Sequence, residues 1–344
     1  MKLPRRALLL LAGLAVAANG ATPSYDSYKS WLIACDNGLR CEAKGFEDGT
    51  NDYPDLRFDR DAGPRAATEV TLSAPFSVGL ADLQVDGEPL HLDAAAWTVV
   101  RRDDFSTFST SQPAAVVALI AQLRNATRLH VGKDASIPLD GMVAALLRMD
   151  DRQGRIGGVT ALIRKGPAAA AAVLAPPPVP VVPSRNGKGV LAAGEEERLI
   201  ARVRTSQATL IGHEDCRANK DLRQSVAYAL DARSALVFIP CTLGAYQGSS
   251  LVFVIPRRDG AAVPFNGTLP FEKDDGGTLQ LTEPDFDPKT GTLSTFGKGR
   301  GLTDCGLSAH WIWDGNRFQL SEATFQGSCG GSGPGDWPTL YRSR

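Results

Sequence analysis

Signatures of several well-known chemistries are missing from this chain of 344 residues. Its six cysteines include no Cys-x-x-Cys pair, the spacing typical of structural zinc sites and of thiol redox centres. Its four histidines include no His-Glu-x-x-His segment, which is the usual zinc-hydrolase motif. No coherent set of nucleophile and base stands out either. We therefore expect no metal, no cofactor and no catalytic residues, so that an enzyme is the less favoured interpretation and stays open.

A strong excess of charge is missing as well. The chain has 37 basic and 38 acidic residues, and without the three basic residues of its first segment a net charge of −4 remains. A chain this close to neutrality gives no reason to expect nucleic acid or an anionic membrane surface as a partner. After the first segment, no apolar run approaches the ~20 residues that a transmembrane helix needs. We expect no membrane span once that segment is removed.

The first segment itself has the layout of a secretory signal peptide. Three basic residues precede an apolar run over 7–18, and small residues then offer cleavage sites after Ala17 and Gly20. The run is too short to cross a bilayer, and a buried core helix is the alternative. We predict a signal peptide over 1–20, its cleavage, and a mature protein in the periplasm.

An even number of cysteines in an exported chain is typical of disulfides. The segment Asn37-Gly38-Leu39 would form a three-residue hairpin loop, with Gly38 free to take a positive φ. In that register Cys35 faces Cys41, at a separation that a disulfide can bridge across two strands. We predict the pair Cys35–Cys41.

Two further pairs complete the predicted disulfides. A hairpin that turns at Asp314-Gly315-Asn316 brings Cys305 and Cys329 to the same open end. The pair Cys216–Cys241 then follows by elimination. Each predicted bridge stays within its own half of the chain.

An Ala/Pro-rich segment divides the chain into these two halves. Between 166 and 189 a run of alanines gives way to several prolines, which lack a backbone donor and favour an extended chain. We predict a semi-rigid linker there, an N-terminal α+β domain over 25–165, and a C-terminal α+β domain with an antiparallel sheet over 190–344. The fold class is α+β: two β-rich domains, each with one or two helices.

The expected elements follow from apolar periodicity. In the first half one helix begins at Pro113 and a second spans 141–151 with Asp140 as its cap. The second half is predicted to begin with helices over 195–204 and 221–230. Strands are expected at 31–35, 69–73, 77–85, 97–101, 235–241, 250–255, 292–296, 308–313 and 317–322.

Two basic segments are candidate sites for an anionic group. The segment 150–155 ends the second helix, where Gly154 suits a cap, and its arginines either compensate the helix dipole or form a polar recognition patch. The segment 297–301 alternates glycine with two cations, so its backbone N–H groups can approach an anion; the alternative is a bulged strand connection. The candidate binding residues are Arg152, Gln153, Arg155, Lys298 and Arg300.

Five ordered segments resemble one known family: Trp31 to Cys41, Ala144 to Arg155, Cys241 to Gln247, Lys298 to Phe318, and the ending Trp337 to Leu340. Together they are similar to the bacterial exported family catalogued as domain of unknown function 1176, over nearly the whole mature chain. The resemblance implies location and architecture, and it brings no activity, cofactor or site residue to carry over. More weakly, the first half resembles the invasion-associated locus B proteins through 31–41 and 138–147.

Three functions stay open at this point. We favour an exported periplasmic protein of the binding or envelope-associated kind, without enzymatic activity, whose partner is an envelope protein or an anionic small molecule. The second is an enzyme that acts on an anionic envelope substrate at a cleft between the halves, using the four cations of the two basic segments. The third is an inhibitor that presents a rigid loop to a periplasmic hydrolase.

Overall fold

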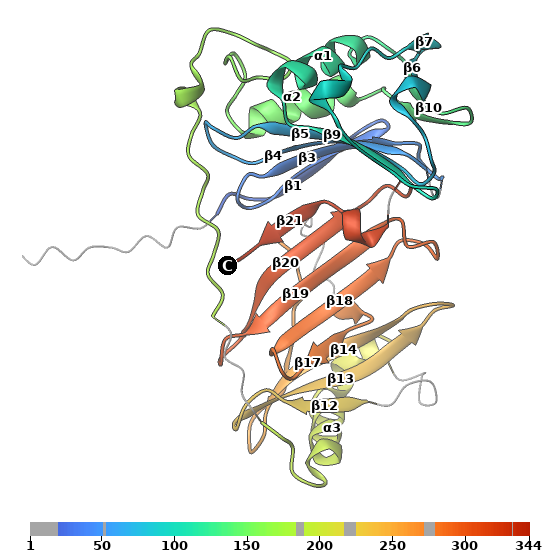
Figure 1. The fold of residues 1–344 in the computed structure, drawn as a ribbon. Helices are drawn as coiled ribbons and strands as arrows, with labels where there is room; N and C mark the ends of the chain where they lie inside the picture. The colour runs from blue at the N-terminus through green and yellow to red at the C-terminus, as the bar shows by residue number, and fades with distance from the viewer. Residues whose placement is uncertain (1–19, 51–52, 184–188, 217–224, 272–278, 332) are drawn as a thin grey trace, which may run out of the picture.

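The computed structural model describes residues 20–50, 53–183, 189–216, 225–271, 279–331 and 333–344. Within these ranges the chain forms four β-sheets and four α-helices (Figure 1). This confirms the predicted α+β class, rich in β-structure. The helices of the described residues are too short or too polar to cross a membrane.

The first half is built on a seven-stranded antiparallel sheet in the order β1-β2-β3-β4-β5-β9-β8. Helices α1 (Pro113–Leu123) and α2 (Met142–Arg152) lie over one face of this sheet (Figure 1). A smaller sheet in the order β11-β10-β6-β7 lies beside the helices. The strands of the large sheet are β1 Ser24–Tyr28, β2 Trp31–Cys35, β3 Cys41–Phe46, β4 Asp55–Arg60, β5 Thr68–Ala74, β8 Thr98–Arg101 and β9 Ser106–Thr110, and those of the small sheet are β6 Leu83–Val85, β7 Glu88–Pro89, β10 Arg128–Val131 and β11 Ala135–Pro138.

The first core lies between the helices and the large sheet. Both helices begin within a residue of the predicted start, and their apolar stripes are buried against alternate residues of β2 to β5. Burial of each large apolar side chain is worth about 1.5–3 kcal/mol, which is why the stripes fix the helices on this face. The buried stripe residues are Val116, Leu119, Ile120 and Leu123 of α1 and Met142, Ala145, Leu146 and Met149 of α2.

The first hairpin forms in the predicted register, with Cys35 opposite Cys41. The residue with positive φ is Leu39, at 59°, and not Gly38 as predicted. The reason is local: Asp36 Oδ1 accepts hydrogen bonds from the backbone N–H groups of Gly38 at 2.7 Å and Arg40 at 2.8 Å. This side chain sets the path of the loop and moves the left-handed residue one position along.

Two other predictions for the first half need correction. Asp140 does not cap α2, because it pairs with Lys29 at 2.8 Å. The cap is Gly141, with φ 103°, and a Cβ there would lie 1.8 Å from the carbonyl oxygen of Tyr28. The predicted strand over 77–85 is shorter, because a 3₁₀ turn, η1 (Leu80–Asp82), comes before β6.

The second half is a three-layer structure. Helices α3 (Glu195–Ser206) and α4 (Ala208–His213) cover a sheet in the order β12-β13-β14-β15, with β16 also paired to β14. The other face of that sheet packs on a sheet in the order β17-β18-β19-β20-β21. The strands are β12 Val226–Ala229, β13 Ser234–Leu243, β14 Gly248–Pro256, β15 Val263–Pro264, β16 Gln280–Thr282, β17 Asp285–Asp287, β18 Thr292–Lys298, β19 Gly306–Trp313, β20 Phe318–Gln326 and β21 Thr339–Arg342.

The predicted helix over 221–230 is wrong where the structure describes it, since residues 226–229 form strand β12. The pairing of Val226 with Phe238 on β13 makes this segment the edge of a sheet with a core on each face. Ala227 faces the helices and Tyr228 faces the other sheet. A strand covered on both faces loses its alternation of polar and apolar residues, and can then pass for a helix. Residues 221–224 lie outside the described ranges.

The three predicted disulfides are all present: Cys35–Cys41, Cys216–Cys241 and Cys305–Cys329. The first closes the β2–β3 hairpin. The second ties the end of the α4 region to β13. The third joins the start of β19 to the chain that follows β20.

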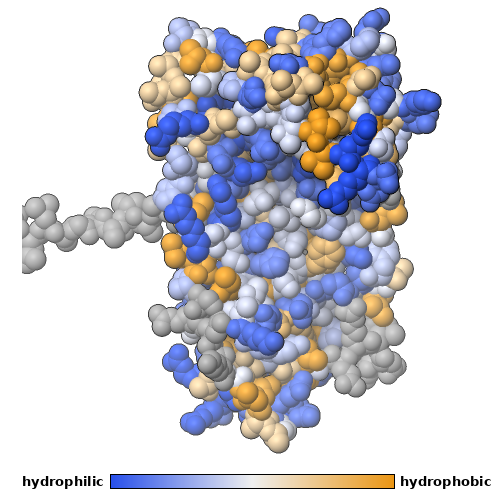
Figure 2. All heavy atoms as spheres, in the orientation of Figure 1, coloured by the Kyte–Doolittle hydropathy of each residue, from blue (hydrophilic) through white to orange (hydrophobic). Residues whose placement is uncertain are grey.

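The two halves are docked on each other, and the face shown in Figure 2 is continuous from one to the other. The free face of the large sheet receives the β20–β21 end of the second half: Lys44 Nζ donates to Gln326 Oε1 at 2.9 Å, and the backbone N–H of Arg342 donates to Asn37 Oδ1 at 3.0 Å. The segment predicted as a linker joins in, because Val182 and Pro180 exchange backbone hydrogen bonds of 2.9 Å with Arg344.

Candidate functional site: a buried arginine beside an apolar cavity

The last turn of α2 holds a buried ion pair. Asp150 accepts a hydrogen bond of 2.7 Å from Nη2 of Arg60, which ends β4, and their side chains are 0% and 1% exposed. Arg60 Nε also donates to Gln153 Oε1 at 2.6 Å. Removing charges from water costs several kcal/mol for each ion, so a buried pair persists only with good geometry and further hydrogen bonds. These bonds attach the end of α2 to the sheet.

Asp150 also organises the loop that follows the helix. The C-cap of α2 is Gln153, and Gly154, the predicted cap, follows it with φ 64°, in the left-handed conformation that commonly ends a helix. The backbone N–H of Arg155 then donates to the carbonyl of Asp150 at 2.7 Å. The second carboxylate oxygen of Asp150 accepts from the backbone N–H groups of Leu162 at 2.8 Å and Ile163 at 3.1 Å. Both oxygens of this carboxylate are therefore engaged inside the protein.

Arg155 is the cation that this arrangement leaves unbalanced. Its side chain is 1% exposed, and its Nη2 donates to the carbonyl of Gly63 at 2.6 Å. Among the residues that the structure describes, its Nε and Nη1 have no hydrogen-bond partner, and neither has the nearby hydroxyl of Thr160. Burial, helped by the neighbouring charge of Arg60, lowers the pKa of Arg155 to about 10, which leaves the guanidinium protonated at neutral pH. The site thus has two arginines and one carboxylate.

Arg155 lines a cavity of about 170 Å³. Apart from Arg60, Thr68, Arg155, Thr160 and Lys165, the lining is apolar. Val117 and Val159 are 43% and 52% exposed, so the cavity reaches the surface between α1 and the loop after α2. The apolar lining residues are Ala66, Ala67, Pro113, Val116, Val117, Val159, Ala161 and Leu162.

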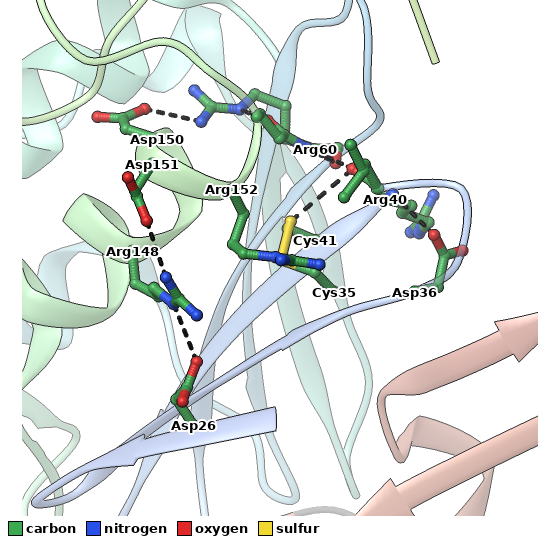
Figure 3. The surroundings of a disulfide bond; sticks show 12 residues. Asp26, Cys35, Asp36, Arg40, Cys41, Arg60, Arg148, Asp150, Asp151 and Arg152 are labelled. Atoms are coloured by element: carbon green, nitrogen blue, oxygen red, sulfur yellow. Dashed lines mark hydrogen bonds and ion pairs between the residues drawn. A yellow bond between two sulfur atoms is a disulfide. The ribbon is translucent and has the colours of Figure 1, made fainter. Parts of the chain in front are cut away.

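The other two candidate residues of α2 hold the chain together. Gln153 is buried, and its Nε2 donates to the carbonyls of Leu39 at 2.8 Å and Arg60 at 2.9 Å. Arg152 lies beside the Cys35–Cys41 hairpin (Figure 3) and donates to the carbonyl of Thr22 at 2.5 Å. Both residues bind the protein's own backbone.

The candidates of the second basic segment lie elsewhere. Arg300 pairs with Asp304 through Nε at 2.8 Å and reaches the carbonyl of Gly49 at 3.2 Å. Lys298 lines a separate cavity of about 290 Å³ within the second half. Gln153 touches the loop before β3 whereas Arg300 touches the loop after it, so the structure does not bring the two basic segments together. Close to Arg300, Asp304 lies beside Cys305 and Cys329, whose sulfur atoms are joined in a disulfide.

Arg60, Gly63 and Thr160 belong to the site and were not predicted from the sequence. Arg60 is an ordinary last residue of a strand, and its spacing of 90 residues from Asp150 carries no signal. The feature that could have pointed to the loop is the density of glycine after α2, where Gly154 and Gly157 both take positive φ.

A second group of buried charges lies between the halves. Glu42, Lys44, Asp55 and Arg57 share the face of the large sheet that meets the second half, where Arg57 pairs with Asp336 at 2.7 Å. Glu42 Oε1 is enclosed, and no group in the described part of the chain forms a hydrogen bond with it. Burial and the nearby carboxylate of Asp59 raise the pKa of Glu42 to about 8. In this group the carboxylates outnumber their cation partners, whereas at Arg155 the cations outnumber the carboxylate.

Comparison with known proteins places the chain in a family. It is 30% identical over 357 residues to the uncharacterized protein YpfG of Escherichia coli (strain K12), with 98% of each chain covered. No solved structure matches the chain. The family described as "Protein of unknown function (DUF1176)" matches residues 25–344, nearly the whole chain, and the protein belongs to that family.

Proposed function

We propose that the protein is exported to the bacterial periplasm and binds a small anionic ligand there through Arg155, without catalysing a reaction on it. Three disulfides support an oxidising compartment, because such bonds persist outside the cytosol. The layout of the first 20 residues supports export by a cleavable signal. The resemblance of the first half to the invasion-associated locus B proteins stays part of this proposal.

One observation carries the proposed binding: Arg155 is buried, charged and only partly hydrogen-bonded beside a cavity that reaches the surface. An uncompensated buried charge is costly, and an anion in the cavity would supply both the missing charge and the missing acceptors. Charge-assisted hydrogen bonds of an arginine to an anion are among the stronger polar contacts in proteins. The Asp150 carboxylate cannot supply them, since its oxygens already serve Arg60 and the loop.

The test uses the mature, oxidised, full-length protein. Thermal unfolding is measured at constant ionic strength with acetate, phosphate, sulfate and a set of longer carboxylates, and any anion that raises the midpoint is then titrated by calorimetry. Arg155→Met should abolish the response, whereas Arg124→Met, which removes an exposed arginine on the same half, should preserve it. A response that survives Arg155→Met would place the binding elsewhere and contradict the proposal.

Export is tested separately. The mature protein isolated from the periplasm should begin between Ala18 and Thr22, and amino-terminal sequencing decides it. An intact Met1 would contradict the proposed export and leave the anion site untouched.

A second candidate function is the hydrolase inhibitor. The loop between β18 and β19 presents Leu302, 55% exposed, and its Gly301 lies beside Tyr246, which is 53% exposed. The Arg300–Asp304 pair and the Cys305–Cys329 disulfide brace this loop, and a braced apolar loop is a common way to block an enzyme cleft. If the protein inhibits an envelope hydrolase, Leu302→Asp should weaken the inhibition, while Arg155→Met should not change it.

A further inference from the structure

We infer that the ligand of the Arg155 cavity is a carboxylate with a short, branched or unbranched apolar chain. This inference rests on the proposed function, because it names the class of anion that the site accepts. The shared chemistry is a single carboxylate joined to a small hydrocarbon group, which can belong either to a free short-chain acid or to the last residue of a peptide.

The charge of the site favours one negative charge. The three buried charges of the site, Arg60, Arg155 and Asp150, sum to a single positive charge, which a monocarboxylate neutralises. Lys165, which also lines the cavity, is exposed, so its charge is largely screened by water. A carboxylate accepts from a guanidinium N–H group in the plane of both. Nε and Nη1 of Arg155 point to different sides of the guanidinium and are enclosed, so a small turn of the side chain toward the cavity would present one of them to the carboxylate. The unpartnered hydroxyl of Thr160, on the same cavity wall, is a further donor. Phosphate or sulfate would bring more charge and more acceptor oxygens than these groups satisfy.

The walls of the cavity favour an apolar chain on that carboxylate. The cavity is lined by Pro113, Val116 and Val117 of α1, by Ala66 and Ala67 of the loop before β5, and by Val159, Ala161 and Leu162. A fully hydrated inorganic anion would leave this surface without contact. An apolar chain instead removes it from water, at roughly 25 cal/mol for each Å² buried.

The volume limits the length of that chain. At about 30 Å³ for each water molecule, a cavity of about 170 Å³ has room for roughly five or six waters. That space suits a carboxylate with a side chain of the size of leucine or valine. The exposed Val117 and Val159 mark the open side, through which a free acid could enter or the preceding residues of a peptide could leave.

The experiment is a calorimetric titration of the mature, oxidised protein with four small ligands of graded chemistry. Isocaproate carries the carboxylate and the apolar chain, isocaproamide lacks the charge, acetate lacks the chain, and inorganic phosphate is a different anion. We expect isocaproate to bind, and each of the others to bind at least about tenfold more weakly, because each removes one of the two kinds of contact. N-acetyl-leucine and N-acetyl-leucinamide mimic the last residue of a peptide with and without its carboxylate. If N-acetyl-leucine binds more tightly than isocaproate, the carboxylate that the site recognises is a peptide carboxyl terminus.

Two variants locate the binding. Arg155→Met should abolish binding of isocaproate, with Arg124→Met as the matched control that keeps it. Val117→Asp changes an exposed wall residue, so it should fold, and it should weaken isocaproate at least about threefold, because it places a charge beside the chain.

The outcomes distinguish the proposed anion binding through Arg155 from the inferred class of ligand. If phosphate or acetate binds through Arg155 as tightly as isocaproate, the inferred ligand class is wrong and the proposed anion binding stands. If isocaproamide binds as tightly as the acid, the carboxylate is not recognised and the inference fails. If none of the anions binds, both the inference and the proposed function are overturned.

Discussion

Buried charged side chains form two groups in this protein, one around Arg155 and one around Glu42. The first group has more positive than negative charge, and the second has more carboxylates than cations. Around Arg155, inside the first half, the carboxylate of Asp150 is already paired with Arg60, and guanidinium N–H groups of Arg155 are left without an acceptor among the described residues. Around Glu42, between the halves, carboxylates crowd one another and one of them retains its proton. A surplus carboxylate can neutralise itself by binding a proton, whereas an arginine cannot lose its proton at neutral pH. The positive imbalance around Arg155 is therefore the basis of the proposed anion binding. The negative imbalance around Glu42 leads us to expect a stability that depends on pH.

The largest effect should come from breaking the balanced pair beside Arg155. Arg60→Met leaves Asp150 buried without its cation, and removal of one partner of a buried pair costs about 3–5 kcal/mol. We expect urea unfolding to show a loss of this size in the free energy of unfolding. The matched Asp150→Asn variant should lose a similar amount, because it also disturbs the hydrogen bonds to the Leu162 and Ile163 backbone.

The next effect concerns the charges between the halves. The pKa of Glu42 is raised from its ordinary 4.5 to about 8 by burial and by Asp59. Between these pH values the unfolded chain has released a proton that the folded protein retains, so this group makes stability fall as the pH rises through that window. Besides Asp59, which lies opposite Glu42 on β4, the charges that act on Glu42 from the same sheet are those of Lys44, Asp55 and Arg57.

Glu42→Gln should remove that part of the pH dependence. Because each tenfold change in proton affinity corresponds to about 1.4 kcal/mol, we expect the variant to be more stable than the wild type by at least about 2 kcal/mol at pH 9, and close to it at pH 5. Urea unfolding at the two pH values measures this. Parallel curves for the two proteins would show that Glu42 is ionised in the fold.

A smaller effect, of opposite sign to that of Arg60, is expected at Arg155. Without ligand, Arg155→Met replaces an unbalanced buried charge by an apolar side chain, which is often stabilising. We expect a gain of about 1 kcal/mol in the free energy of unfolding of the ligand-free protein. A saturating ligand should reverse the order, since it stabilises only the wild type by mass action. A loss as large as that of Arg60→Met would mean that Arg155 is a structural partner only.

The smallest effect is predicted for an exposed pair. Lys29 and Asp140 are joined at 2.8 Å, with side chains 69% and 62% exposed. Exposed pairs contribute about 0–1 kcal/mol, so Asp140→Ala should change the stability by less than about 0.5 kcal/mol. A larger loss would restore Asp140 as a helix cap, the role that the sequence suggested.

The comparison also shows what the sequence could and could not reveal. Local patterns were sufficient for the two helices of the first half, for the Cys35–Cys41 hairpin and for the strands around Trp311, because each depends on residues near one another in the chain. Strand β12 was missed because its two faces are covered by different layers, which erased the alternation that identifies a strand.

The candidate site could be predicted only in part from the sequence, because its contacts join residues that lie far apart in the chain. The segment 150–155 was a candidate from the sequence, and Arg155 was among its residues, but the sequence could not separate the roles of the residues inside it. Arg152 and Gln153 bind backbone carbonyls of residues more than 90 positions away, and Arg60 supplies the cation for Asp150. Long-range pairing of this kind leaves no periodic signal in one sequence.

The most direct test of the central claim observes Arg155 itself. In a ¹H–¹⁵N spectrum of arginine side chains, the Nε–H signal that disappears in Arg155→Lys belongs to this residue, and isocaproate is then titrated at pH 6.5. The account predicts a shift of that one signal that saturates with the same affinity as the calorimetric titration, because the carboxylate becomes its acceptor. A signal that stays in place while the protein is exposed to an excess of isocaproate, acetate and phosphate in turn would contradict the account.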